Sequence, residues 1–167
     1  MFHFAFITLL FLSTTASEQK SQDKFSKQLN KIISAVKVDL KSIQGNKKGV
    51  TITDTTYFSR FTLVGTTENE VHYLIENTGC GICFSFSATI KSFVIADDAK
   101  ATVQLWKEKI NTALGTHISP EEYRDENEGI INEGYAFSIH GVDVLVYSVE
   151  LPNIDTHSVY LSILKSK

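Results

Sequence analysis

The chain has 167 residues, of which 43% are hydrophobic and 21% are charged, and its formal net charge at pH 7 is −3. This length fits a single domain that can bury its own core without many covalent cross-links, and only two cysteines are present. The mildly acidic balance argues against general nucleic-acid binding, which depends on cationic contacts with phosphates.

The first 16 residues, MFHFAFITLLFLSTTA, have the form of a secretory signal peptide. Residues 4–12 are apolar apart from one threonine, and Thr14 and Ala16 place small residues where a signal peptidase cuts. The apolar run is shorter than the ~20 residues of a membrane-spanning helix. A buried N-terminal strand or helix is the alternative, since neither Lys nor Arg precedes the run. We predict a secreted or periplasmic protein whose single mature domain is 17–167, without a transmembrane segment.

Residues 22–44 show the clearest helical periodicity in the chain. Ser21 is the expected N-cap, and Gly45 is the expected residue just beyond the C-terminus of the helix. The GNKKG stretch that begins at Gly45 should then form a turn. Apolar residues recur every three or four positions and define one buried arc, with lysines on the opposite side. This apolar arc consists of Phe25, Leu29, Ile32, Ile33, Val36, Leu40 and Ile43.

Beyond residue 50 the pattern becomes that of β-strands. Residues 50–65 are rich in β-branched and aromatic side chains, and residues 69–77 alternate in polarity. Asn77-Thr78-Gly79 should turn the chain into a hairpin. After Cys80 the alternation is stricter and predicts a half-buried antiparallel strand. Ile82, Phe84, Phe86, Ala88 and Ile90 should face one side, and Cys83, Ser85, Ser87 and Thr89 the other.

A second helix should begin at an N-cap, Asp97 or Asp98, and end at Gly115. Its expected buried arc contains Ala99, Val103, Trp106, Ile110, Ala113 and Leu114.

The acidic stretch 119–134 is expected to be a solvated loop. Strands follow in 135–151 and 157–165, with His140-Gly141 forming either a tight hairpin or a bulge.

The element order is a helix, three strands, a helix and two or three further strands. Strands never alternate singly with helices, which disfavours a parallel doubly wound sheet. We therefore predict an α+β fold in which an antiparallel sheet of five to six strands carries both helices on one face, in the order α-β-β-β-α-β-β(-β). A helix followed by strands occurs twice along the chain, without a repeat at the level of residues.

Cys80 and Cys83 form a C-x-x-C motif for which three chemistries compete. Redox catalysis needs the first thiol at a helix N-terminus, where the dipole stabilises the thiolate, but here a strand follows the motif. A structural disulfide fits an exported protein better. Its Cα atoms must lie within ~7 Å, whereas residues three apart in a strand are ~10 Å apart. A Cys80–Cys83 disulfide, which we predict, therefore requires a turn at 80–83 and a strand that begins at Cys83 or later.

Zinc is the third alternative, because the two cysteines supply half of the ligands of a structural site. His72 lies on the neighbouring predicted strand and is the best candidate to join Cys80 and Cys83. The remaining candidates, His117, His140 and His157, have no recognised spacing to the motif. We therefore assign no metal and no cofactor.

The sequence contains no nucleophile elbow, P-loop or zinc-protease motif, so it offers no positive reason to propose an enzyme. We expect a non-catalytic domain that binds a small ligand or a protein partner between sheet and helices. One alternative is a thiol–disulfide or metal-dependent enzyme centred on Cys80, Cys83 and His72. Another is a cell-envelope or matrix protein whose sheet edge pairs with a different chain.

The export and disulfide predictions share one test. Protein purified from cells that export it is expected to begin near Ser17, and reduction should increase its mass by a pair of hydrogen atoms. Intact-mass spectrometry before and after reduction measures both properties. A chain that retains residues 1–16 would contradict export. Two free thiols together with a zinc ion lost on denaturation would make the cysteines the working site instead.

Overall fold

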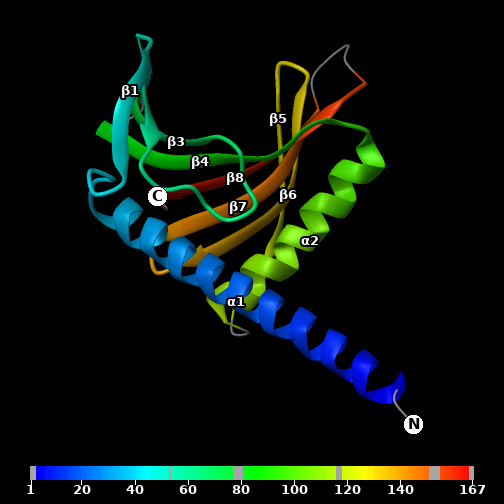
Figure 1. Ribbon diagram of the computed structural model, residues 1–167. Helices are drawn as coiled ribbons and strands as arrows, with labels where there is room; N and C mark the ends of the chain where they lie inside the picture. Colours follow the sequence, from blue (N-terminus) through cyan, green and yellow to red (C-terminus); the bar gives the residue numbers. More distant parts are fainter. Residues whose placement is uncertain (1–2, 53, 77–80, 116–117, 151–154, 166–167) are drawn as a thin grey trace.

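The computed structural model of the chain describes the backbone of residues 3–52, 54–76, 81–115, 118–150 and 155–165, with side chains except at 3–16, 75–76 and 81–82. Within these residues the chain forms two helices and eight strands (Figure 1). The first half contains α1 (His3–Val38), β1 (Gln44–Val50), β2 (Asp54–Ser59), β3 (Asn69–Glu76) and β4 (Gly81–Val94). The second half contains α2 (Ala96–Leu114), β5 (Glu121–Asn127), β6 (Ile130–Ile139), β7 (Val142–Glu150) and β8 (His157–Lys165).

All eight strands belong to one antiparallel sheet with the order β1-β2-β3-β4-β8-β7-β6-β5. Each half of the chain therefore contributes one helix and four consecutive strands, and β4 pairs with β8 where the halves meet. Both helices lie on the same side of the curved sheet (Figure 1). The predicted α+β class, with an antiparallel sheet and two helices on one face, is confirmed.

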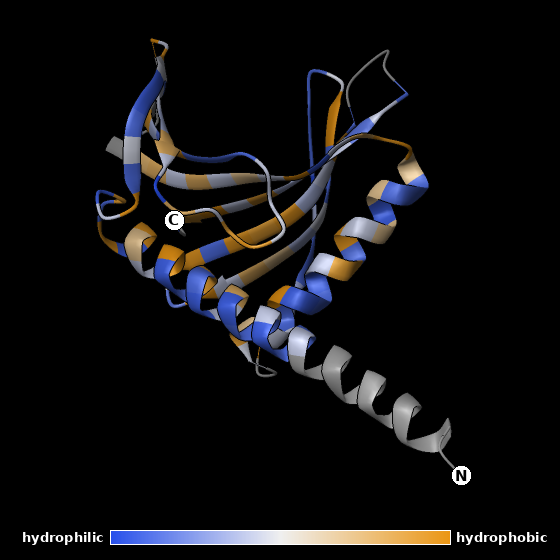
Figure 2. Ribbon diagram, in the orientation of Figure 1, coloured by the Kyte–Doolittle hydropathy of each residue, from blue (hydrophilic) through white to orange (hydrophobic). Residues whose placement is uncertain are grey.

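The predicted five to six strands and the predicted order α-β-β-β-α-β-β(-β) are wrong. The sheet has eight strands, four after each helix, because β1 and β5 add to the strands that were predicted. The two additional strands are the edge strands of the sheet. The GNKKG stretch, predicted to be a turn, lies in β1, and part of the predicted acidic loop is β5. Most residues of both strands are exposed, and both are mainly hydrophilic (Figure 2). Charged edge strands resist unwanted pairing, so they lack the apolar alternation that reveals inner strands.

The buried arc of the first helix is confirmed, but the bounds of α1 differ from the prediction. In the arc of α2, four of the six predicted residues are buried, whereas Ala113 and Leu114 are half-buried. All seven apolar residues of the first helix's arc are buried, from Phe25 to Ile43. The helix passes through Ser21 without a cap and ends at Val38, because Leu40 adopts a left-handed conformation with φ of 58°. The Leu40 N–H still donates to the Ala35 carbonyl at 3.0 Å, and its side chain is fully buried. Burial thus offsets a backbone conformation that usually requires glycine.

The N-cap of the second helix lies two or three residues before the predicted caps, Asp97 and Asp98. Ile95 occupies the N-cap position without a side-chain hydrogen bond. Asp97 and Asp98 therefore lie in the first turn, where their negative charges interact favourably with the positive end of the helix dipole. The predicted end is confirmed, because Gly115 has φ of 91° and donates its N–H to the Asn111 carbonyl.

The core lies between the helices and one face of the sheet. A cross-strand row of fully buried side chains runs through β3, β4, β8, β7 and β6 on this face. The row consists of Val71, Phe86, Ile163, Val144 and Phe137, each paired with the next. The two helices meet on this layer where the rings of Phe25 and Trp106 pack edge to face, 5.5 Å apart. The core role predicted for Trp106 is therefore confirmed.

Lys109 of α2 ties the connection between β2 and β3 to this helix contact. Its ammonium group lies 4.1 Å from the centre of the Phe25 ring and 4.2 Å from that of Trp106, and it donates to the Val64 carbonyl at 3.0 Å. The Val64 N–H in turn donates to Gln28 of α1. Burial lowers the pKa of Lys109, while the two rings and the carbonyl favour its cation.

Two-residue hairpins join β5 to β6 and β6 to β7. His140 and Gly141 have φ of 49° and 79°, and Glu128 and Gly129 have φ of 52° and 80°. Positive φ at both central residues is the signature of a type I′ turn, whose twist matches that of the flanking strands. The tight-hairpin alternative for His140-Gly141 is thus the correct one. The Asn77-Thr78-Gly79 turn lies outside the described residues, although the β3–β4 pairing that it should connect is confirmed.

Gly134 of β6 provides a stability test. A Cβ added there would lie 2.0 Å from the Val146 carbonyl oxygen, which belongs to the neighbouring strand. Gly134→Ala should therefore lower the free energy of unfolding by roughly 2–4 kcal/mol. Gly49→Ala on the edge strand β1, where a Cβ meets nothing within 4 Å, is the matched control and should change it by about 0.5 kcal/mol or less. Urea unfolding measures both, and equal values for the two variants would contradict the close approach at β6.

Candidate functional site

Two of the predicted site residues, Cys83 and His72, lie on the neighbouring strands β4 and β3. Cys83 lies on β4 opposite Leu74, whereas Cys80 lies outside the described residues, so their disulfide stays a prediction. The strand already begins at Gly81, where the sequence argument placed a turn if the cysteines are joined. Redox catalysis at the motif likewise stays untested.

The described histidine candidates lie on different elements of the sheet. His72 lies on β3, His140 in the β6–β7 hairpin and His157 opposite Glu150 at the far end of β7, while His117 lies outside the described residues. Among the described residues no three His, Cys, Asp or Glu side chains are grouped so that they could hold a metal ion.

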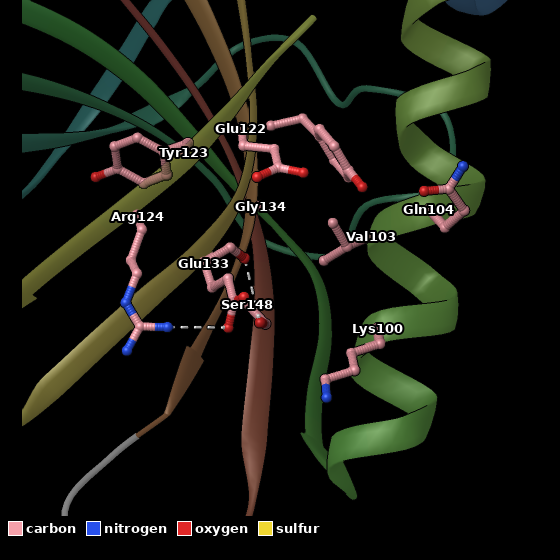
Figure 3. Close-up of a pocket in the computed structure, with 10 residues that line it drawn as sticks. Lys100, Val103, Gln104, Glu122, Tyr123, Arg124, Glu133, Gly134 and Ser148 are labelled. Atoms are coloured by element: carbon pink, nitrogen blue, oxygen red, sulfur yellow. Dashed lines mark hydrogen bonds and ion pairs between the residues drawn. The ribbon is translucent and has the colours of Figure 1, made fainter.

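A cavity of about 440 Å³ opens between α2 and the helix-facing side of β5, β6 and β7 (Figure 3). We call it the α2 groove. It exists because the edge of the sheet extends beyond the area that α2 covers. In Figure 3, Lys100, Val103 and Gln104 come from α2 and face Glu122 and Glu133 across the opening. Its lining consists of Lys100, Val103, Gln104, Glu122, Tyr123, Arg124, Glu133, Gly134, Tyr135 and Ser148.

The floor of the α2 groove is apolar and its rim is charged. Val103 is only 5% exposed, and the ring of Tyr135 is half-buried. The Lys107 ammonium lies over this ring, 4.0 Å from its centre. At the rim, Arg124 lies 3.7 Å from Glu133 and 3.8 Å from Glu126. These ion pairs are long and largely exposed, so water and salt screen them strongly. Their charges therefore remain available to a ligand.

The groove continues toward the N-terminal end of α2. A second cavity of about 230 Å³ shares Lys100, Glu133 and Ser148 with it and reaches Glu150 and His157. The Ser148 hydroxyl donates to the Glu133 carbonyl at 3.3 Å, as drawn in Figure 3. The combined opening is elongated along α2 and carries charges of both signs over its length.

A separate cavity of about 500 Å³ lies on the opposite, helix-free face of the sheet, and we call it the His72 cleft. Strands β3, β4 and β8 supply most of it. Its lining consists of Thr67, Glu68, Glu70, His72, Ser87, Thr89, Ser92, Phe93, Ser158 and Tyr160.

His72 stands in the middle of a polar network that crosses three strands. Its Nδ1 lies 3.1 Å from Oδ2 of Asp54 on β2, and its Nε2 lies 2.9 Å from the Ser87 hydroxyl on β4. Thr56 donates to the same Asp54 oxygen at 3.1 Å. Glu70 approaches Nε2 at 3.5 Å and is itself paired with Lys48. The imidazole is therefore fixed in place from both ring nitrogens.

The sequence of carboxylate, imidazole and hydroxyl matches that of a catalytic triad, but the surroundings differ. Acyl transfer also needs preorganised donors, often backbone N–H groups, for the developing oxyanion. Ser87 pairs with Glu70 on one side and with Ser162 on the other, so its backbone belongs to a regular ladder. Glu70 also competes for the imidazole nitrogen that would act as base. We interpret the network as a rigid recognition surface.

Sequence reasoning found His72 but neither of the two cavities. The alternation of Ser85, Ser87 and Thr89 did predict a polar face on β4, and their position on the helix-free side is confirmed. The polarity pattern of one strand does not show which residues of the neighbouring strands lie beside it. Asp54 and Ser87 contact His72 only because of the register in which β2, β3 and β4 pair. The sequence carries no pattern that indicates the α2 groove, because its acidic side chains lie in a stretch that was predicted to be a solvated loop.

Comparison with protein-family models, with curated proteins and with solved structures finds no match for this chain. Among the described residues, no helix combines the length and the apolar character that crossing a bilayer requires.

A row of tyrosines leads across the helix-free face to the His72 cleft. It starts at Tyr123, which borders the α2 groove but whose ring lies on the side away from α2 (Figure 3). The rings of Tyr123 and Tyr147 are 5.8 Å apart and pass over Gly134, and those of Tyr147 and Tyr160 are 6.1 Å apart. The Tyr147 hydroxyl pairs with that of Ser162 at 3.0 Å. Burial raises the pKa of Tyr147 above its usual 10.0, and nearby Tyr160 adds to the effect.

This raised pKa predicts alkaline destabilisation. Because the unfolded chain releases the Tyr147 proton near its usual pKa of 10.0 while the folded chain retains it, this stabilisation is complete below pH 10 and is lost as pH rises through the folded pKa. Tyr147→Phe should therefore show a smaller fall in the free energy of unfolding between about pH 8 and about pH 11 than the parent chain. Urea unfolding at both pH values measures it, and identical falls would contradict the prediction.

Proposed function

We propose that this chain is an exported, non-catalytic domain that binds a short peptide in the α2 groove. The observation that carries the proposal is the pairing of an apolar floor with a rim of both charge signs, in a cavity whose volume lies in the range of ligand sites. Export rests on residues 1–16, and the binding site rests on the groove.

The chemistry of the groove favours a ligand with donors, acceptors and an apolar part. A ligand carboxylate would pair with Lys100 or Arg124, and an amine with Glu122 or Glu133. An apolar side chain would cover Val103 and the ring of Tyr135. A short peptide with free termini carries all these groups, and the elongated opening along α2 suits an extended chain.

The non-catalytic part of the proposal is supported by the contacts at the groove. Its serine, Ser148, donates to a backbone carbonyl, so its hydroxyl is not activated by a base. Lys100 and Arg124 are exposed cations, which bind and orient anions well. The enzyme alternative at Cys80, Cys83 and His72 remains open to the mass measurement proposed above.

Pairing of a sheet edge with another chain is supported less well. The ladder between β1 and β2 contains two register shifts, which twist that edge away from regular pairing. The other edge, β5, is regular but carries four carboxylates on seven residues, Glu121, Glu122, Asp125 and Glu126. Such a charged edge repels a second copy of itself.

A blocking substitution at the mouth of the groove tests the proposal. Gln104 lines the groove from α2, so Gln104→Trp should occlude it and weaken peptide binding at least tenfold, about 1.4 kcal/mol. Leu105→Trp is the matched control, because Leu105 is 67% exposed on the same helix and does not line the cavity. It should bind like the parent chain.

The probe is a pool of synthetic tri- and tetrapeptides with free termini, followed by saturation-transfer NMR and then by calorimetry with the peptides that bind. Lys100→Glu and Arg124→Glu should shift the preference away from peptides with additional carboxylates. No binding by the parent chain, or equal weakening in both tryptophan variants, would refute the assignment of the groove.

A further inference from the structure

We propose that the His72 cleft is a second ligand site and that it takes a saccharide that is neutral or carries an amine. The cleft lies on the opposite face of the sheet from the α2 groove, so this inference does not depend on the proposed peptide site. It rests on three features of the cleft, namely its backbone, its charge and its array of hydroxyl groups.

The first feature is an irregular stretch of backbone at the end of β4. The ladder between β4 and β8 shifts register between Thr89 and Lys91 and again between Lys91 and Val94. Each shift inserts an extra residue, and such bulges redirect side chains and are common next to binding sites. Thr89, Ser92 and Phe93 all come from this doubly bulged stretch, and all three line the cleft.

Phe93 itself is held in a costly arrangement. Its φ of 56° lies in the left-handed region, where glycine or asparagine is the usual occupant. Its side chain is 83% exposed, so core packing does not compensate for the strain, in contrast to buried Leu40. An exposed aromatic ring in a strained conformation at the rim of a polar cavity contributes little to stability. Binding explains it, since such strain concentrates at ligand sites.

The second feature is the charge of the cleft. Glu68 and Glu70 line it, and among the described residues the lining contains neither lysine nor arginine. The Lys48 ammonium is already paired with Glu70 and approaches from outside the lining. An anionic ligand would therefore approach two carboxylates without a lysine or arginine among the described lining residues to bind it, whereas a neutral or cationic ligand would not be repelled.

The third feature is the density of groups that both donate and accept hydrogen bonds. Hydroxyls from β4 and β8 line the cleft together with the imidazole, and each can adjust its proton to the ligand. The fixed position of His72, bonded to Asp54 and Ser87, limits the ordering that binding requires. A sugar presents hydroxyls that match such an array, and the apolar face of its ring packs on an aromatic side chain such as Phe93. The surrounding hydroxyls belong to Ser87, Thr89, Ser92, Ser158 and Tyr160.

The test distinguishes the contribution of the Phe93 ring to binding from the effect of the strained backbone at this position. Calorimetry with cellohexaose, maltohexaose, chitohexaose and a chitosan hexamer should reveal binding, with oligogalacturonate as the acidic arm. Phe93→Asn removes the ring and relieves the backbone, so it should raise the melting temperature and weaken binding at least tenfold. Phe93→Tyr keeps both ring and strain, and its affinity should stay within about twofold of the parent value.

Glu128→Asn is the matched control for strain. Glu128 also has positive φ, but it lies in the β5–β6 turn and does not line the cleft. This variant should raise the melting temperature and leave saccharide affinity unchanged. Gln104→Trp, which blocks the α2 groove, should likewise leave it unchanged, so failure of one site is distinguishable from failure of the other.

Three results would overturn the proposal. The first is the absence of binding to every neutral and amine-bearing oligosaccharide by the parent chain. The second is a preference for oligogalacturonate. The third is unaltered affinity in Phe93→Asn, which would show that the ring takes no part.

Discussion

The pairing of β4 with β8 is the contact on which the rest of the structure depends. Each half of the chain folds its four strands into a sheet that is too narrow to cover two helices. Joining the halves at this seam places Phe86 and Ala88 beside Ile163 and Leu161, all within 2% of complete burial. The resulting wide apolar face is what both helices cover, and without the seam each half would expose it to water.

Both candidate sites occur where this regular arrangement stops. On the helix side, α2 does not reach the edge of the sheet, and the uncovered residues of β5 and β6 form the wall of the α2 groove. On the other face, the seam itself becomes irregular, and the two bulges of β4 turn Ser92 and Phe93 toward the His72 cleft. The same sheet thus provides rigid support for both sites, which favours precise positioning of their side chains.

The parts of the fold that could be predicted from the sequence are those with strong apolar periodicity. The buried arcs of the helices and the alternation of β4 follow from contacts that every buried face requires. The edge strands β1 and β5 carry no such pattern, because only one neighbour and little core constrain them. The cleft depends on register, since Asp54, His72 and Ser87 are distant along the chain and meet only once β2, β3 and β4 are aligned. No single-strand pattern contains that information.

The alternation of side chains also decides how the two sites relate. Along β8 and β7, successive residues point to opposite faces, so Ser148 borders the groove while Tyr147 belongs to the row that reaches the cleft through Tyr160. The sites therefore share backbone but not side chains. Ligand binding at one site would alter the affinity of the other site only if it shifted the strands themselves. The shared strands β7 and β8 resist such shifts, because each is hydrogen-bonded to a neighbouring strand on both sides. The two sites should act independently, because coupling requires an element with two discrete arrangements that both ligands bias.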